Sequence, residues 1–133
     1  MAQRRLFTLD EANGLLQWLE SQLQRIRSLQ IDLSDLNRQL QVLAQEVRGN
    51  GHGGVARKVE AKRKELNALE TLLHTLTQGV EDRGILLKDL DRGLVDFPAL
   101  REGREVYLCW LLGETTIEFW HDVDTGFAGR RPL

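Results

Sequence analysis

The residues best suited to chemistry gather near the C-terminal end, between Glu118 and Arg131. A histidine, three acidic residues and two arginines lie there among two glycines. Imidazole and carboxylate groups together can bind a divalent metal, and arginine can hold an anion. The candidate ligand or partner face comprises Glu118, His121, Asp122, Asp124, Arg130, Asp96, Tyr107 and Trp120. Its candidate metal ligands are His121 and Asp124. The alternative to a ligand site is a C-terminal tail that packs on a sheet through ion pairs.

Two further reactive side chains occur in apolar, strand-like segments. Asp96 directly precedes Phe97-Pro98. Its carboxylate is expected either to accept backbone N–H bonds or to pair with an arginine, and a buried pair of that kind could be half of an active site. The arginine candidates are Arg104, Arg130 and Arg131. Cys109 is expected to face Glu118, whose charge would raise the pKa of the thiol and disfavour a nucleophile.

Two patterns that suggest nucleotide or nucleic-acid binding have simpler explanations. Residues 49–54 satisfy G-x-G-x-x-G, but a helical segment precedes them, whereas a dinucleotide site requires a strand. A weak anion site beside Arg57 and Lys58 remains as an alternative. The basic residues of 57–64 are interrupted by Glu60, are followed by Glu65 and carry no aromatic for base stacking, which indicates a solvated helix face.

The elements that position these residues begin with a leucine seam. Apolar residues recur about every 3.5 residues along 12–47 and again along 55–80. When the chain folds back at the glycines, pairs such as Leu36 with Leu66 keep the same sum of residue numbers. Lys62 lies on the seam opposite Leu40, where its stem can pack while its amine reaches out. Thr8 and Glu11 form a capping box that begins the first helix, which should run to about residue 48.

From residue 85 the pattern changes to short strands, in the segments 85–90, 94–97, 105–112 and 116–121. Pro98 is expected to end the second of these. A two-residue turn at Gly113-Glu114 would join the last two. That register puts Trp110, Leu108 and Val106 on one apolar face, together with Ile117, Phe119 and His121. The opposite, mixed face would pair Cys109 with Glu118 and Tyr107 with Trp120.

These patterns predict an α+β fold in one domain, residues 1–133. A long antiparallel, coiled-coil-like helical hairpin spans 8–82, with a tip loop at 49–54. An antiparallel meander of three or four strands spans 85–122, and a tail follows at 123–133.

Composition narrows the function classes. The 133 residues carry a net charge of −2, which gives no general attraction to nucleic acid or anionic membrane. Cys109 is the single cysteine, so an internal disulfide framework is excluded and a reducing cytoplasm is expected. The opening MAQRRLFTLDEA lacks an apolar stretch, and no run of eighteen apolar residues follows, so we expect neither a signal peptide nor a membrane span.

The C-terminal segments GLVDFPA, EVYLCW and FWHDVDTGFAGR, with the opening LFTLDEAN, resemble the bacterial family called domain of unknown function 2203. The resemblance covers the whole chain and implies a small cytosolic protein, without an activity, substrate or cofactor. The residues favour a non-enzymatic interaction or scaffold protein that self-associates as a homodimer or higher oligomer, with no cofactor. The alternative is a small metal- or anion-binding protein, or an enzyme, with its site at the C-terminal sheet edge.

Overall fold

The computed structural model of the chain describes residues 5–50 and 53–133. The chain divides into two compact units. The hairpin unit comprises Ile26–Leu76, and the sheet unit comprises the described residues up to Arg25 together with Thr77–Leu133. The α+β class is confirmed, because long helices and an antiparallel sheet are both present.

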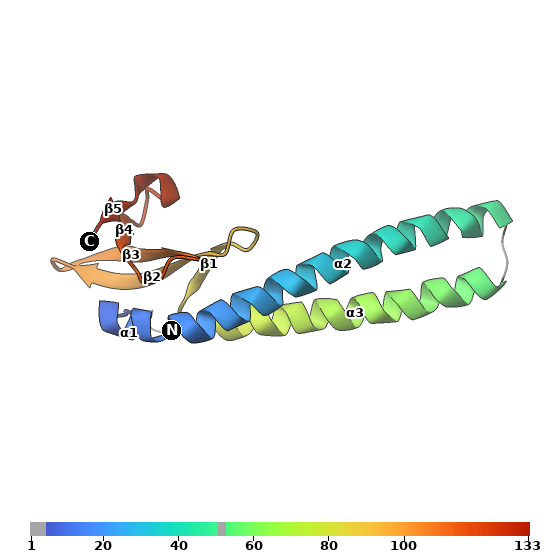
Figure 1. Ribbon diagram of the computed structural model, residues 1–133, viewed down its shortest axis with the longest axis horizontal. Coiled ribbons are helices and arrows are strands. Elements are labelled where there is room, and N and C mark those ends of the chain that lie inside the picture. Colours follow the sequence, from blue (N-terminus) through green and yellow to red (C-terminus); the bar gives the residue numbers. More distant parts are fainter. Residues whose placement is uncertain (1–4, 51–52) are drawn as a thin grey trace. The chain divides into compact units, whose positions relative to one another are not determined.

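The hairpin unit is built from the antiparallel helices α2 (Leu16–Asn50) and α3 (Gly53–Glu81), whose ends belong to the sheet unit (Figure 1). Lys62 Nζ donates a hydrogen bond to Gln39 Oε1 at 2.5 Å, which agrees with the predicted fold-back. The side chain of Lys62 is half-buried, as a residue that packs its stem on the seam should be. Most seam leucines between Leu40 and Leu73 are also only half-buried, because two helices cannot enclose a seam from every side.

The loop between the two helices is shorter than the predicted tip loop 49–54. Helix α2 continues to Asn50 and α3 begins at Gly53, while residues 51–52 lie outside the described part of the chain. Glycine disfavours a helix by only about 1 kcal/mol per residue, so a long helix can extend through it.

The sheet unit begins with the short helix α1 (Leu9–Gly14). The predicted capping box is confirmed, since Thr8 Oγ1 accepts from Glu11 N at 3.1 Å and Thr8 N donates to Glu11 Oε1 at 3.0 Å. The prediction of one uninterrupted helix was wrong at Leu15, where a turn separates α1 from α2. The Leu15 N–H bonds to Ala12 O at 3.1 Å, three residues back, which tightens the chain at this point.

Five antiparallel strands lie side by side in sequence order. They are β1 (Leu86–Asp89), β2 (Leu94–Arg101), β3 (Arg104–Leu111), β4 (Phe119–Asp122) and β5 (Arg131–Pro132). The prediction of three or four strands missed β5, which lies in the expected tail after the 3₁₀ turn η1 (Phe127–Gly129) and pairs with β4. Two residues carry too little pattern to be recognised as a strand.

Pro98 lies inside β2 and does not end it, contrary to the prediction. Its carbonyl accepts the Phe7 N–H at 2.7 Å, and its ring nitrogen points to the same side, away from β3. Strand β1 pairs with β2 only as far as Asp96, so the donor that proline lacks is not needed there.

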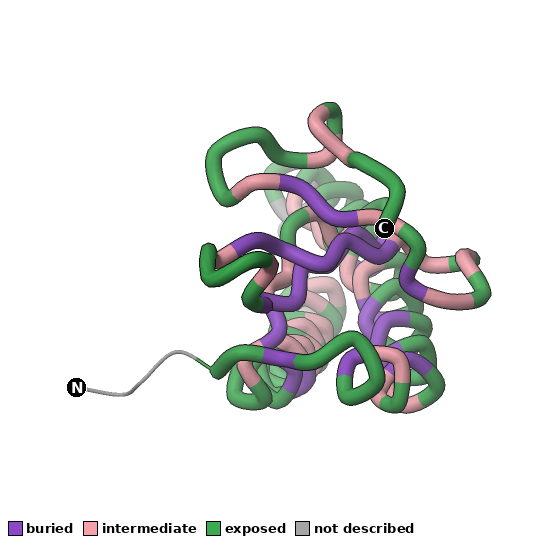
Figure 2. Tube along the Cα trace, turned by 90° about the vertical axis from the view of Figure 1, so that its left-hand side faces the viewer, coloured by how far each residue is buried: buried purple, intermediate pink, exposed green. Residues whose placement is uncertain are grey.

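One face of the sheet packs on the N-terminal segment. Phe97 meets Phe7 edge to face, with ring centroids 5.2 Å apart. Alternation puts Val95 of β2 and Leu108 and Trp110 of β3 on the same side, and all are buried. Figure 2 shows buried residues running along these strands.

The register of β4 differs by one residue from the prediction. Tyr107 pairs with His121 and Leu108 with Trp120, so every β4 side chain lies on the face opposite to the expected one. The segment just before β4 is bonded to α1, where Asn13 Oδ1 accepts hydrogen bonds from Thr116 Oγ1 and Ile117 N, both at 2.9 Å. Thr116 and Ile117 thus bond to α1 and lie outside the β3–β4 ladder, and we expect these bonds to set the register in place of the two-residue turn.

Candidate metal centre

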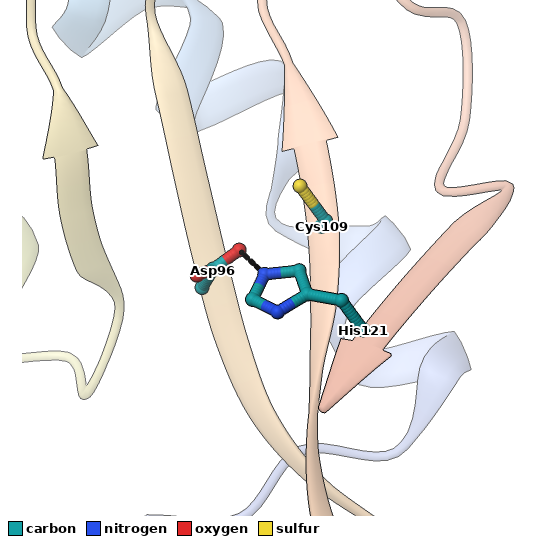
Figure 3. Close-up of side chains that lie close together, drawn as sticks. All are labelled: Asp96, Cys109 and His121. Carbon is teal, nitrogen blue, oxygen red and sulfur yellow. Dashed lines mark hydrogen bonds and ion pairs between the residues drawn. The ribbon is translucent and has the colours of Figure 1, made fainter. Parts of the chain in front are cut away.

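Three chemically distinct side chains project from neighbouring strands to the same side of the sheet (Figure 3). Asp96 of β2 pairs directly with Cys109 of β3, and His121 of β4 pairs with Tyr107, two residues along from Cys109. Alternation therefore places all three on the face opposite to Phe97. One carboxylate oxygen, the thiol sulfur and one imidazole nitrogen all lie within 4.8 Å of one another.

The cluster is buried. Asp96 and His121 are each 2% exposed, and Cys109 is fully covered. His121 Nε2 lies 3.0 Å from Asp96 Oδ1, and His121 Nδ1 lies 2.7 Å from the Asp122 carbonyl oxygen. Because a carbonyl oxygen only accepts, Nδ1 must carry a hydrogen. Nε2 therefore shares one proton with the Asp96 carboxylate. When that proton is absent, the lone pair of Nε2 can bind a metal ion.

Burial raises the pKa of the Cys109 thiol to about 12, and the charge of Asp96 adds to the effect, while Arg130 acts in the opposite direction. A thiol of this kind is protonated at neutral pH and is a poor nucleophile. The sequence predicted correctly that the pKa of Cys109 is raised, but it attributed the rise to Glu118. Glu118 does not oppose Cys109, because the shifted register puts Phe119 there.

Arg130 holds the C-terminal segment beside the cluster. Its Nη2 donates to Glu114 Oε1 at 2.7 Å and to the Cys109 carbonyl at 3.3 Å, and its guanidinium lies 4.1 Å from the centre of the Phe119 ring. The sequence left an arginine or backbone N–H groups as candidate partners of Asp96, and the structure gives it a different partner. The carboxylate of Asp96 pairs with His121, which the predicted register had placed on the other face.

Tyr107 is the other predicted residue that the structure brings to the cluster. Its ring stands edge-on to the His121 imidazole, with ring centroids 5.5 Å apart, and it is 6% exposed. Trp120 lies on the opposite face, where the guanidinium groups of Arg101 and Arg131 lie over its ring. The predicted pairing of Tyr107 with Trp120 was therefore wrong.

The remaining acidic residues of the predicted face stay outside the cluster. The Asp122 side chain forms an ion pair with Arg104, so only its backbone carbonyl reaches His121. Glu118 and Asp124 are exposed, and Asp124 lies in the turn after β4. The group that the structure assembles around His121 consists of Asp96 and Cys109, without Asp124.

One sequence signal could have found two of the three residues, Asp96 and Cys109. Glu102 and Gly103 both have positive φ, 54° and 76°, and form the tight turn between β2 and β3. A two-residue turn containing glycine between two apolar runs predicts a hairpin, and this one would have placed Asp96 opposite Cys109.

Comparison with known proteins adds a family. The model described as "Uncharacterized conserved protein (DUF2203)" matches residues 5–133. The chain belongs to the DUF2203 family. Searches of curated proteins and of solved structures found no match. The DUF2203 family is uncharacterised, so it supplies no activity for the cluster. None of the helices in the described part of this DUF2203 chain is long and apolar enough to cross a membrane.

The donor set of the DUF2203 cluster suits a borderline-soft transition metal. Thiolate, imidazole and carboxylate are all zinc ligands, whereas calcium and magnesium prefer oxygen alone. A ligating histidine almost always donates its other ring N–H to a carbonyl or carboxylate, and the His121 Nδ1 contact with Asp122 O is of this kind.

Proposed function

We propose that this DUF2203 protein binds a zinc-class transition metal through Asp96 Oδ, Cys109 Sγ and His121 Nε2. The observation that carries the proposal is the convergence of these three donor atoms within 4.8 Å in a buried site. In a tetrahedral site, ligand atoms about 2.0–2.3 Å from zinc lie roughly 3.3–3.8 Å from one another. Movements of about 1 Å or less would bring the three side chains to that geometry.

The metal would replace two protons. One is the proton shared between Asp96 and His121, and the other is the thiol proton of Cys109. The thiolate and the carboxylate together would neutralise a divalent cation, which removes the cost of burying either charge alone. One coordination position remains for a ligand outside the trio.

The role that best suits this site is structural. The three donors come from three strands, so a bound metal would cross-link β2, β3 and β4 and would bind only the folded sheet. Burial of all three donors leaves little room for a substrate, which favours the non-enzymatic class.

The test is metal analysis of the full chain, purified without chelator, together with its melting temperature before and after chelation. We expect about one zinc per chain and a lower melting temperature after chelation. Asp96→Asn keeps the side-chain shape and should weaken zinc affinity at least tenfold. The exposed Asp124→Asn is the matched control and should bind like the wild type. A metal-free protein whose melting temperature responds to neither zinc nor chelator would contradict the proposal.

A second proposal concerns the hairpin unit, which we infer self-associates as a homodimer or higher oligomer through its helices. Ile31, Val42 and Leu72 are 63%, 57% and 40% exposed, and a contact with a second copy would remove these aliphatic side chains from water. Light scattering at micromolar concentration that gives a single species of 15.2 kDa would refute self-association.

A reducing compartment such as the bacterial cytoplasm would keep the single cysteine a thiol or a metal ligand.

A further inference from the structure

One side of α2 carries an ordered stripe of charged and apolar residues. At 100° per residue the stripe covers an arc of about 100°, the width of a helix face that packs on a partner. Its charged and apolar members, in chain order, are Arg27, Ile31, Asp35, Arg38, Val42 and Glu46, and the polar Ser28 and Gln45 lie within the same arc. All are exposed except Asp35, which is half-buried, and all belong to the hairpin unit.

The order of charged and apolar residues in the stripe is complementary to the same order in the opposite chain direction. Its order is basic, apolar, acidic, basic, apolar, acidic. An antiparallel second copy of α2, with its two-fold axis between Asp35 and Arg38, sets every residue against a suitable partner. Arg27 then faces Glu46, Ile31 faces Val42 and Asp35 faces Arg38. A two-fold contact uses the same patch on both copies, so each of these pairs occurs twice.

Space for the partner lies beside the stripe. Asp35, Arg38 and Val42 line a groove of about 530 Å³ between α2 and α3, together with Gln39, Leu43, Lys58 and Lys62. Within one chain, Asp35 and Arg38 form an ion pair three residues apart. In the antiparallel pair, the two copies of these residues would form a four-charge network.

We propose that the hairpin unit dimerises through this stripe, by an antiparallel contact between α2 and the same helix of a second copy. The inference rests on the self-association proposed above and names its surface. Self-complementary charge favours a second copy over another occupant. The alternative occupant is an acidic helix of a different protein, attracted by Arg38, Lys58 and Lys62.

Two opposite charge reversals test the contact in the full chain. Asp35→Arg sets an arginine against Arg38 of the second copy, and Arg38→Asp sets an aspartate against its Asp35. Each variant alone should dimerise at least tenfold more weakly than the wild type in sedimentation equilibrium. An equimolar mixture should recover wild-type affinity as a heterodimer, because each reversed charge then meets its opposite.

The mixture separates the contact between chains from the ion pair within one chain, which is broken in both variants. Arg63→Glu, an exposed reversal on α3, is the control and should leave dimerisation unchanged. Circular dichroism checks that each variant keeps its helix content. A wild-type oligomer that ignores both reversals, or single variants that are not rescued by mixing, would overturn the stripe and leave self-association standing. A monomeric wild type would overturn both and leave the groove to an acidic partner.

Discussion

Replacing Asn13 by alanine tests what sets the register of β4. The Asn13 side-chain oxygen accepts two hydrogen bonds, from the Thr116 hydroxyl and from the Ile117 backbone N–H. Each such bond contributes about 1 kcal/mol net, and a buried N–H left without a partner costs about 1–3 kcal/mol. Ile117 is only 3% exposed, so water cannot easily replace the lost acceptor. We therefore expect Asn13→Ala to lower the free energy of unfolding by about 2–4 kcal/mol.

Urea denaturation followed by circular dichroism measures this loss. Gln17→Ala is the matched control, because Gln17 lines the same cleft as Asn13 and its side chain is exposed. The control should stay within about 0.5 kcal/mol of the wild type. If Asn13→Ala is equally neutral, Asn13 does not hold the segment before β4, and another contact must shift the register.

Three further outcomes follow from the structure. Cys109 should resist thiol-modifying reagents at pH 8 in the folded protein and react only in denaturant, because it is fully buried and its pKa is raised to about 12; rapid labelling of the native protein would contradict this. Hydrogen bonds from the side chain and backbone of Arg92 lower the pKa of Asp89, so its stabilising effect exists above the unfolded value near 4 and disappears as the pH falls through the folded value. Asp89→Asn should therefore lower the melting temperature at pH 7 but not at pH 2, and an equal effect at both would refute the assignment. A Cys pair at Leu36 and Leu66 should oxidise within one chain, whereas success only for a pair shifted by one helical turn would show a different register.

The sequence predicts the helical hairpin well because its signal is repeated. Many apolar residues at the same spacing predict the same pairing of the two helices. The Lys62–Gln39 hydrogen bond agrees with the register derived from them. The capping box is equally local, since Thr8 and Glu11 are three residues apart. A pattern held within one segment needs no knowledge of distant contacts.

The candidate site is harder to predict because no segment contains it. Asp96, Cys109 and His121 lie on three strands, and their convergence depends on two registers. The turn at Glu102-Gly103 fixes the first and leaves a sequence signal. We attribute the second to Asn13, which is more than a hundred residues away in the chain, and alternation then places His121 on the face opposite to the expected one.

Cobalt substitution tests the metal centre most directly. Cobalt(II) occupies zinc sites, and a thiolate bound to it gives charge-transfer absorbance in the near ultraviolet. Because Cys109 is the only cysteine of the chain, any such band must come from it. We predict a band that saturates at about one cobalt per chain, is abolished by Cys109→Ser and persists in Asp124→Asn. A folded wild-type protein that shows no thiolate band would contradict the proposed metal centre.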